Sequence, residues 1–187
     1  MANNVTNVAI GKPKITGAIW RAPLGTALPK DASTELSAEF KCLGYISDDG
    51  FKQETKRDSD TVKAWGGDTV ARPQTDFDDT FSATLIEITN AENLKAVFGD
   101  DNVTVDESGK TISIDVKSDE LPFATYVIDI ALSNKALKRI VYASAKPTEI
   151  GEITYNDSDP VGYETTFGAI ASADLDGATH REFIKLA

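Results

Sequence analysis

Residues 123–145 read FATYVIDIALSNKALKRIVYASA, and this stretch decides the fold class. In its first half, every second residue from Tyr126 to Leu132 is aromatic or branched and apolar, so these side chains lie on one side of an extended chain. Alternate side chains of a strand point to the same face of a sheet, so Asp129 is expected on the opposite face. The apolar run at 136–145 predicts a further strand, because β-branched and aromatic residues favour a pleated surface.

Similar runs occur on both sides of this stretch, with turn-forming residues between them. The DDG at 48–50 separates 42–47 from 51–57 and predicts a hairpin, since Asp-Gly is a strong turn signal. About nine or ten short strands are expected in all, which is typical of a mostly β protein, a β-sandwich or partial barrel. The other expected strands are 15–21, 80–88, 102–106, 111–117, 148–155, 161–171 and a C-terminal strand or arm at 178–187.

One short flanking α-helix is predicted over residues 89–98. Thr89 and Glu92 have the spacing of a capping box, in which the hydroxyl and the carboxylate satisfy free amides of the first turn. Gly99 is suited to the left-handed backbone that ends many helices. Apolar side chains three and four positions apart form one face, which a helix this short must pack against a sheet. That face consists of Leu94, Val97 and Phe98.

Three segments do not fit regular elements of a single domain spanning 1–187. Residues 1–14 are polar and predict an extended N-terminal arm. Residues 22–39 contain two prolines and a glycine and form a loop too long for a hairpin turn. Residues 58–69 are charged, and Trp65 is their only large apolar side chain, so a projecting loop is expected there.

The charge balance of the chain is acidic and uneven. Lys plus Arg number 19 and Asp plus Glu number 30, which gives a net charge of −11. Residues 1–75 carry 10 basic and 9 acidic side chains, whereas 76–187 carry 9 and 21. Such a chain is not expected to bind nucleic acid tightly, because affinity for the phosphate backbone comes from cationic contacts. The acidity predicts either a solubilising surface or a surface that repels an anion.

The residues needed for catalysis or metal binding are scarce. The chain has one histidine, His180, and one cysteine, Cys42, so neither a zinc site nor a disulfide is expected. His180 is interpreted as a lone histidine of the surface or of the C-terminal arm, and Cys42 as a core thiol. The acidic groups at 76–79 and 156–159 are interpreted as Asx-type turns, with calcium binding as the alternative. No enzyme activity and no cofactor are predicted.

Nothing in the sequence predicts export or membrane insertion. The N-terminal segment lacks the apolar core of a signal peptide. No apolar run approaches the roughly 18 residues of a membrane span. Assembly in a cytoplasm is therefore expected.

Several stretches, in order and spacing, resemble the major tail proteins (tail tube proteins) of long-tailed, non-contractile bacteriophages, the siphophages. TGAIWRAPLGTALPKDASTEL at 16–36 resembles the N-terminal pattern of this family, and GYISDDGF at 44–51 resembles its "GYvseDG" pattern. The charged segment 54–71 with its AWGGDTV run, TLIEITNAENLKAVFG at 84–99 and the closing stretch 146–169 are similar to later parts of the family. The resemblance covers nearly the whole chain.

The resemblance implies a structural subunit of the virion tail. Its fold would be a β-sandwich with a flanking helix, and hexameric rings of it would stack into a hollow tube. The lumen would conduct viral DNA without binding it specifically. The partners implied are other copies of the chain, a tape measure protein, a tail terminator and baseplate or tail-tip proteins, with no membrane partner.

The resemblance also implies which segments contact other copies. The arm at 1–14 and the loops at 22–39 and 58–69 would be ordered by neighbouring subunits. Trp65 is the candidate anchor between rings, because aromatic anchors dominate interface energetics. A Trp65 side chain folded back on its own hairpin is the alternative. The other candidate contacts are Lys63, Arg57 and Pro29.

Two carboxylates are candidates for the wall of the lumen. Asp115 and Asp129 lie on the polar faces of otherwise apolar strands, where they could repel DNA within the screening length of about 8–10 Å. Both could equally face the outer solvent.

Two other kinds of protein stay open. One is an adhesin or carbohydrate-binding β-sandwich module of a virion. The other is the inner-tube protein of a contractile injection system.

Overall fold

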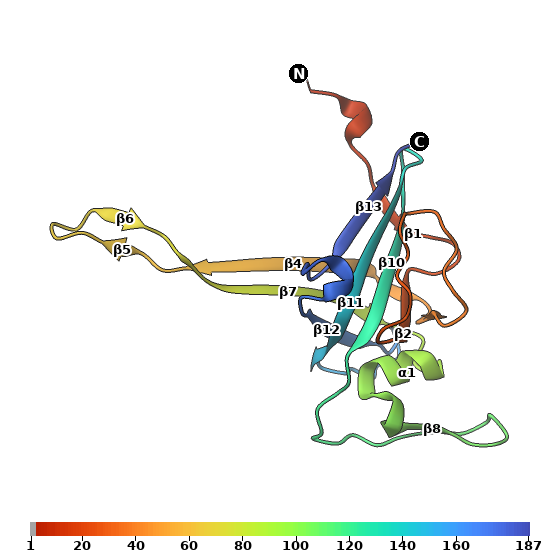
Figure 1. The fold of residues 1–187 in the computed structure, drawn as a ribbon. Helices are drawn as coiled ribbons and strands as arrows, with labels where there is room; N and C mark the ends of the chain where they lie inside the picture. The colour runs from red at the N-terminus through yellow and green to blue at the C-terminus, as the bar shows by residue number, and fades with distance from the viewer. Residues whose placement is uncertain (1–2) are drawn as a thin grey trace.

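The computed structural model describes residues 3–187 as antiparallel strands with one α-helix. Figure 1 shows a body from which one long hairpin projects. The strands are β1 (Gly11–Pro13), β2 (Ile19–Pro23), β3 (Lys41–Cys42), β4 (Ile46–Ser59), β5 (Val62–Lys63), β6 (Thr69–Ala71), β7 (Gln74–Leu85), β8 (Val103–Val105), β9 (Ile112–Ile114), β10 (Ala124–Leu132), β11 (Leu137–Ile150), β12 (Tyr163–Ala169) and β13 (Arg181–Lys185). The helices are α1 (Ala91–Phe98) and the 3-10 turns η1 (Val5–Asn7), η2 (Asp100–Asn102) and η3 (Ala173–Leu175).

Nine strands form one sheet in the order β3-β2-β10-β11-β12-β7-β4, with β1 also beside β10 and β13 also beside β11. The sheet divides along β11, whose first part (137–141) pairs with β13 and whose later part (145–150) pairs with β12. Two small sheets, β5-β6 and β8-β9, lie outside it. The mostly β class with one flanking helix is thus confirmed, as an open and branched sheet.

The central pair β10 and β11 is buried on both faces, which explains its nearly continuous apolar sequence. On one face Phe81 and Phe167 stack with ring centroids 4.7 Å apart, and Tyr126 and Tyr142 pack around them. The same core includes the buried side of α1. On the other face a smaller core is covered by the long loop and by β13. That second core consists of Ala22, Phe40, Val127 and Val141, packed against Trp20, Leu28, Leu36 and Phe183.

Helix α1 forms where it was predicted, but its N-cap is one residue later than the capping-box pattern indicated. The side chain of Asn90 accepts a hydrogen bond from the backbone N–H of Glu92 at 3.0 Å, so Asn90 and not Thr89 is the cap. The side-chain amide of Asn90 also donates a hydrogen bond to the carboxylate of Glu87 at 3.0 Å. Gly99 ends the helix with φ of 94°, as expected for glycine there.

The predicted hairpin at 48–50 is wrong. Residues Ile46–Ser59 form one continuous strand, β4, whose partner is the distant strand β7. Gly50 has φ of 77°, and the register against β7 shifts between Ile46 and Phe51. The turn signal therefore marks an irregularity of the bulge type, where a glycine bends a strand without ending it.

The division between two other expected strands also differs from expectation. The strand predicted at 136–145 continues through Pro147 as far as Ile150, so the expected separate strand at 148–155 does not exist. A register shift opposite β12 lies between Pro147 and Glu149, where a proline can be accommodated.

The N-terminal segment is only partly an arm. Residues 1–2 of the expected arm lie outside the described residues. Residues 3–10 contain the turn η1 and extend beyond the sheet, whereas Gly11–Pro13 pair with β10 as β1. Figure 1 shows this segment at the same end of the molecule as the C-terminus.

Candidate functional site: a projecting arm and its root

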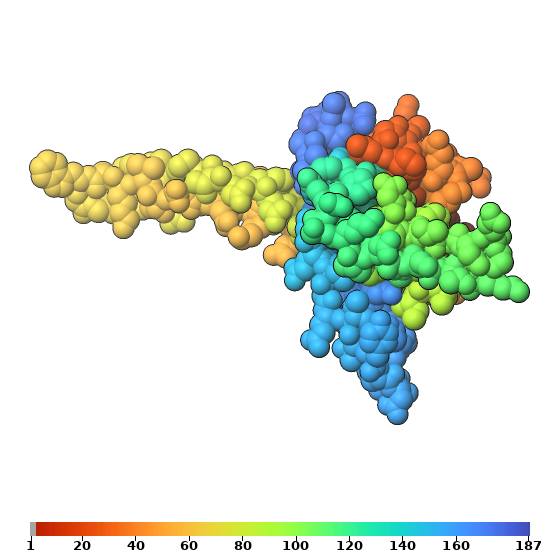
Figure 2. Space-filling view, turned by 90° about the horizontal axis from the view of Figure 1, so that it is seen from below, coloured from red at the N-terminus to blue at the C-terminus, as the bar shows by residue number. Residues whose placement is uncertain are grey.

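A long, exposed hairpin arm projects from the body, and it is defined here as residues 54–78. It consists of the outer parts of β4 and β7, extended by β5 and β6. Figure 2 shows it as a narrow projection that leaves the body on one side. The loop predicted at 58–69 is the end of this longer arm.

A tight turn presents one tryptophan at the tip of the arm. Gly66 and Gly67 have φ of 116° and 99°, conformations that favour glycine. The amide of Gly67 donates to the carbonyl of Ala64 at 3.0 Å and closes the turn. Trp65 is 107% exposed, so its ring contacts nothing in its own subunit. A Trp65 folded back on its hairpin is therefore not what the isolated subunit shows.

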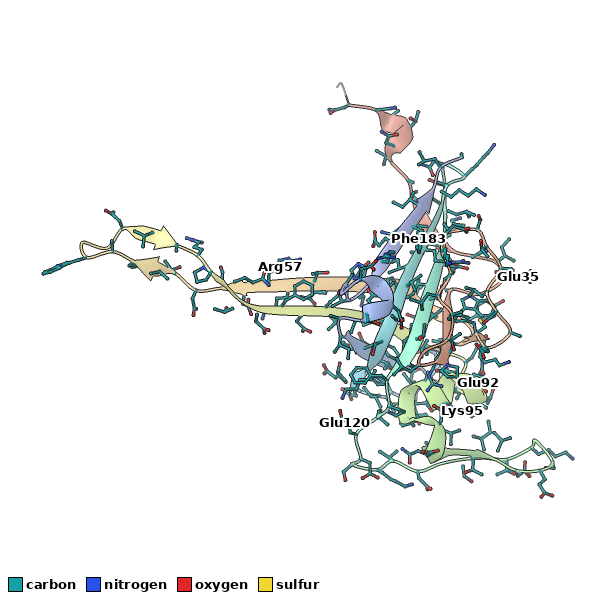
Figure 3. All side chains as sticks on the ribbon, viewed as in Figure 1. Glu35, Arg57, Glu92, Lys95, Glu120 and Phe183 are labelled. Carbon is teal, nitrogen blue, oxygen red and sulfur yellow. The ribbon has the colours of Figure 1, made fainter. Side chains whose placement is uncertain are left out.

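The arm has no hydrophobic core of its own. Phe77 is half-buried, and its ring is covered by the Arg57 guanidinium, 4.4 Å from the ring centroid. Arg57 also donates to the side-chain carbonyl of Gln74 at 3.0 Å. Figure 3 shows Arg57 on the inner part of the arm, between the body and the tip. A two-stranded hairpin without a packed face is marginally stable in water, so this arm is suited to being covered by another molecule.

A buried polar cluster holds the root of the arm against the C-terminal segment. Asp79 in β7 is fully buried and accepts hydrogen bonds from the Thr179 hydroxyl and from His180 Nδ1, the latter at 2.6 Å. The Thr55 hydroxyl donates to the same carboxylate at 3.3 Å. His180 Nε2 lies 2.8 Å from the Gln53 amide nitrogen. Because a buried carboxylate is costly unless it is hydrogen-bonded, this cluster fixes where the arm leaves the body.

Tyr142 of β11 borders this cluster. Its ring centroid is 5.2 Å from that of His180, and its buried hydroxyl has no hydrogen-bond partner within residues 3–187. Burial, and then the nearby Asp79 carboxylate, raise the pKa of Tyr142 well above its usual value. The phenol therefore stays neutral beside Asp79.

The interpretation of His180 as a lone surface histidine is wrong. Its side chain is 20% exposed and hydrogen-bonds to a carboxylate. A signal was available, because Asp79 alternates with Phe77 and Phe81 on one face of a strand, and a carboxylate on an apolar face needs a partner. The distance of about a hundred positions between the partners hid the pairing.

The geometry of this cluster does not match a hydrolytic triad. A triad needs the hydroxyl to donate to the histidine and the histidine to the carboxylate. Here the Thr179 hydroxyl and the His180 ring both donate to Asp79, so the hydroxyl is not activated by the imidazole.

The long loop at 22–39 is held by its own subunit, contrary to the expectation that neighbours order it. Arg139 of β11 is 1% exposed and donates to the backbone carbonyls of Asp31 and Thr34 at 3.1 and 2.7 Å. The Asp31 carboxylate accepts hydrogen bonds from the hydroxyl and amide of Thr34 and from the amide of Ser33, and these hold its pKa below its usual value. Pro29, a candidate contact, lies half-buried in this loop, on a different segment from Trp65.

The two lumen candidates have opposite environments. Asp129 is 3% exposed, and the Arg139 guanidinium binds it through two hydrogen bonds of 2.6 and 2.8 Å. It therefore offers no free charge to a lumen, which corrects that expectation. Asp115 follows β9 and is exposed.

The acidic groups considered as cation sites lie in other arrangements. At 156–159 the Asn156 side chain accepts hydrogen bonds from the amides of Ser158 and Asp159, so the Asx-type turn is confirmed. At 76–79 the residues lie within strand β7, paired with β4 in the arm and its root, so the Asx-type turn expected there is wrong. Within residues 3–187, no three His, Cys, Asp or Glu side chains gather as metal ligands would.

Over the described part of the chain, no helix has the length and apolar character that crossing a membrane requires.

Comparison with known proteins identifies the family. The model of a family described as "Phage tail tube protein" matches residues 1–182. The chain therefore belongs to the phage tail tube protein family, and it is a structural component of a phage tail. A search of curated proteins gave no match.

Among solved structures, the chain is similar to one described as "Cryo-EM structure of the anti-feeding prophage cap (AFP tube terminating cap)". The sequence identity is 9%, all of both chains is covered, and the TM-score is 0.49.

Proposed function

We propose that this protein forms the wall of a tail tube, as hexameric rings stacked into a hollow tube that conducts viral DNA. The family match supports a tail subunit, and the arm supports its polymerisation. Other tail components, among them a tape measure protein, a terminator and tip proteins, would contact the ends and the lumen of such a tube. Assembly would take place in the host cytoplasm.

The observation that carries this proposal is an arm that its own subunit leaves uncovered. Residues 54–78 project from the body with a fully exposed Trp65 at the tip. A buried cluster of hydrogen bonds fixes their root, and with it the direction in which the arm leaves the body. A neighbouring subunit would supply the missing packing, with Trp65, Lys63 and Arg57 among the contacts. Contacts between different surfaces of identical subunits propagate into rings or helical stacks.

Electron microscopy of the purified protein at increasing concentration tests the proposal directly. Rings or tubes are expected, since identical copies are the proposed partners. An adhesin-like module would stay monomeric. Strictly monomeric protein at every concentration and salt would overturn the proposal.

Two variants test the role of the arm. Deletion of 58–69 should leave a folded monomer that does not form tubes, because these residues contribute nothing to the core of the body. Trp65→Ala should weaken assembly about tenfold or more, the range of a central aromatic anchor. Its matched control is Tyr155→Ala, which removes an aromatic ring that is 73% exposed in another loop.

Unchanged unfolding of each monomer, measured by circular dichroism, separates an assembly defect from a folding defect. If the deletion variant forms normal tubes, the arm is not part of the interface between subunits.

A further inference from the structure

One end of the molecule carries a cluster of lysines, although the whole chain is acidic. We call it the lysine end; it consists of Lys12, Lys14, Lys135, Lys138 and Lys185. These residues surround the turn between β10 and β11, with β1 on one side and β13 on the other. Residues 3–14, 130–138 and 184–187 contain no acidic side chain.

The strand register explains why these lysines gather. Lys12 is opposite Ala131, Ala131 is opposite Leu137, and Leu137 is opposite Lys185, so the two lysines flank the hairpin in one row. Lys12, Lys185 and Lys135 are exposed, and no carboxylate within residues 3–187 lies within 4.0 Å of them.

The other two lysines have acidic neighbours. Lys138 pairs with Glu182 at 2.9 Å. Lys14 lies 3.6 Å from Asp129, whose charge is already matched by Arg139. The lysine end therefore keeps an excess of positive charge.

The opposite end of the molecule is acidic. We call it the acidic end; it is the segment 99–122, which contains η2, β8 and β9. It carries seven acidic and two basic side chains. Asp100 is paired with Arg21 and Glu120 with Lys146. The remaining carboxylates are exposed and have no cation within 4.0 Å in the described chain: Asp101, Asp106, Glu107, Asp115 and Asp119.

The two ends are separated by the length of the central hairpin. Strand β10 starts at Ala124, next to the acidic end, and finishes at Leu132, in the lysine end. Figure 1 shows α1 and β8 at one extremity of the body and both termini at the other, and Figure 3 labels Glu120 at the first of these.

Both ends also expose apolar side chains, which a purely solvated charged surface does not need. At the acidic end Val116 is 80% exposed. At the lysine end the exposed apolar residues are Val5, Val8, Ile10, Ile184 and Leu186.

We propose that the acidic end of one copy docks on the lysine end of another copy. The inference rests on the proposed function only in taking a second copy as the partner. With a net charge of −11, two copies repel each other in most orientations, and this one brings opposite charges together. The contact joins two different surfaces, so it is heterologous and repeats from copy to copy.

This contact and the arm point in different directions. The arm leaves the body sideways from the line that joins the two ends (Figure 1). A tube wall needs contacts in two directions, around the ring and along the axis. End-to-end docking supplies one of these directions, and the arm supplies the other.

Charge reversal at each end tests the docking. Lys12→Glu with Lys185→Glu reverses the lysine end, and Glu107→Lys with Asp119→Lys reverses the acidic end. Each pair should raise the critical concentration for assembly about tenfold or more, because several attractive exposed charge pairs become repulsive. The variant with all four substitutions should recover assembly, since the two ends are complementary again. Asp115 is kept unchanged because it is a candidate for the wall of the lumen.

Lys30→Glu with Lys41→Glu is the matched control for the lysine-end pair, with the same change of net charge at exposed positions of a loop and of β3. It should assemble as the wild type does. The critical concentration is measured by pelleting and electron microscopy.

Each other outcome has a definite meaning. Failure of the wild type to assemble would reject the proposed function. Wild-type assembly with normal assembly of both end variants would reject only the docking. Failure of the four-substitution variant, alongside a working control, would also reject it. If the Lys12/Lys185 variant assembles normally but loses binding to duplex DNA, the lysine end is a nucleic-acid surface and the proposal is wrong.

Discussion

Asp129 and Arg139 show how one buried pair can organise a large part of the chain. The guanidinium binds the Asp129 carboxylate on its own sheet and the carbonyls of Asp31 and Thr34 in the loop above it. A charge in a nearly water-free position is tolerated only when it is paired and hydrogen-bonded. The pair therefore forms a polar boundary of the second core, between the sheet and the loop.

Removal of one partner should be strongly destabilising. Asp129→Ala leaves Arg139 charged and uncompensated, so the free energy of unfolding should fall by about 3–5 kcal/mol. Urea unfolding of the monomer measures this loss. The control is Asp115→Ala, which removes an exposed carboxylate and should change stability by no more than about 0.5 kcal/mol. Equal losses in the two variants would contradict the buried-pair account.

At the scale of elements, the start of α1 tests which residue caps the helix. Asn90→Ala should cost about 1 kcal/mol, because the Glu92 amide loses its side-chain acceptor. Thr89→Ala should be nearly neutral, since Thr89 is exposed and makes no capping hydrogen bond in residues 3–187. Thermal unfolding of both variants measures the difference. A larger effect at Thr89 would restore the capping-box prediction.

The connection between β2 and η2 should make stability depend on acid pH. Arg21 donates to both carboxylate oxygens of Asp100 at 2.9 and 2.5 Å, and these hydrogen bonds hold the pKa of Asp100 below its usual value. A depressed carboxyl pKa stabilises the fold above the unfolded pKa of about 3.9. This contribution is lost as pH falls through the lower, folded pKa.

Urea unfolding at pH values from about 6 down to about 3, which covers the range where carboxyl groups titrate, checks this dependence. Asp100→Asn should show a shallower loss of stability toward low pH than the wild type. Asp119→Asn is the control, because it removes an unpaired carboxylate from the same segment. Identical slopes in the wild type and Asp100→Asn would contradict the role of the Arg21 pair.

Local sequence patterns predicted the elements that local forces determine. Helix α1 was predictable because Gly99 and the apolar face of the helix are encoded within a few residues. The hairpin at 48–50 was wrongly predicted because Asp49–Gly50 satisfies the local turn rule, whereas pairing with the distant β7 keeps β4 extended. Long-range strand pairing competes with local turn propensity, and a single sequence does not show which of the two determines the structure.

The same limit applies to the side chains that matter at the site. Trp65 at the tip was predictable, because a large apolar residue between charges and glycines has nothing nearby to pack on. The burial of Asp129 was not, since alternation gives its face but not that the loop covers this face. The Asp79–His180 pairing needed contacts between segments about a hundred residues apart.

At the scale of the whole molecule, the proposed lumen places a requirement on exposed charge. If Asp115 lines the tube, Asp115→Lys adds a cation that holds the phosphate backbone, so DNA release from particles should slow. The measurement is the rate of DNA ejection from particles built with the variant, after electron microscopy confirms normal tails. Glu152→Lys, the same change at another exposed carboxylate, is the control. Unchanged ejection with Asp115→Lys would place that residue away from the lumen.

In the proposed tube, an arm without a core also affects the timing of growth. The first copies to meet must give up the conformational freedom of two hairpins before many contacts exist to offset that loss. A copy that joins an existing end meets a surface that is already ordered, so only one hairpin loses its conformational freedom. Starting such a polymer is thus slower than extending it, so at concentrations too low for spontaneous initiation a pool of free subunits can persist until a template is offered.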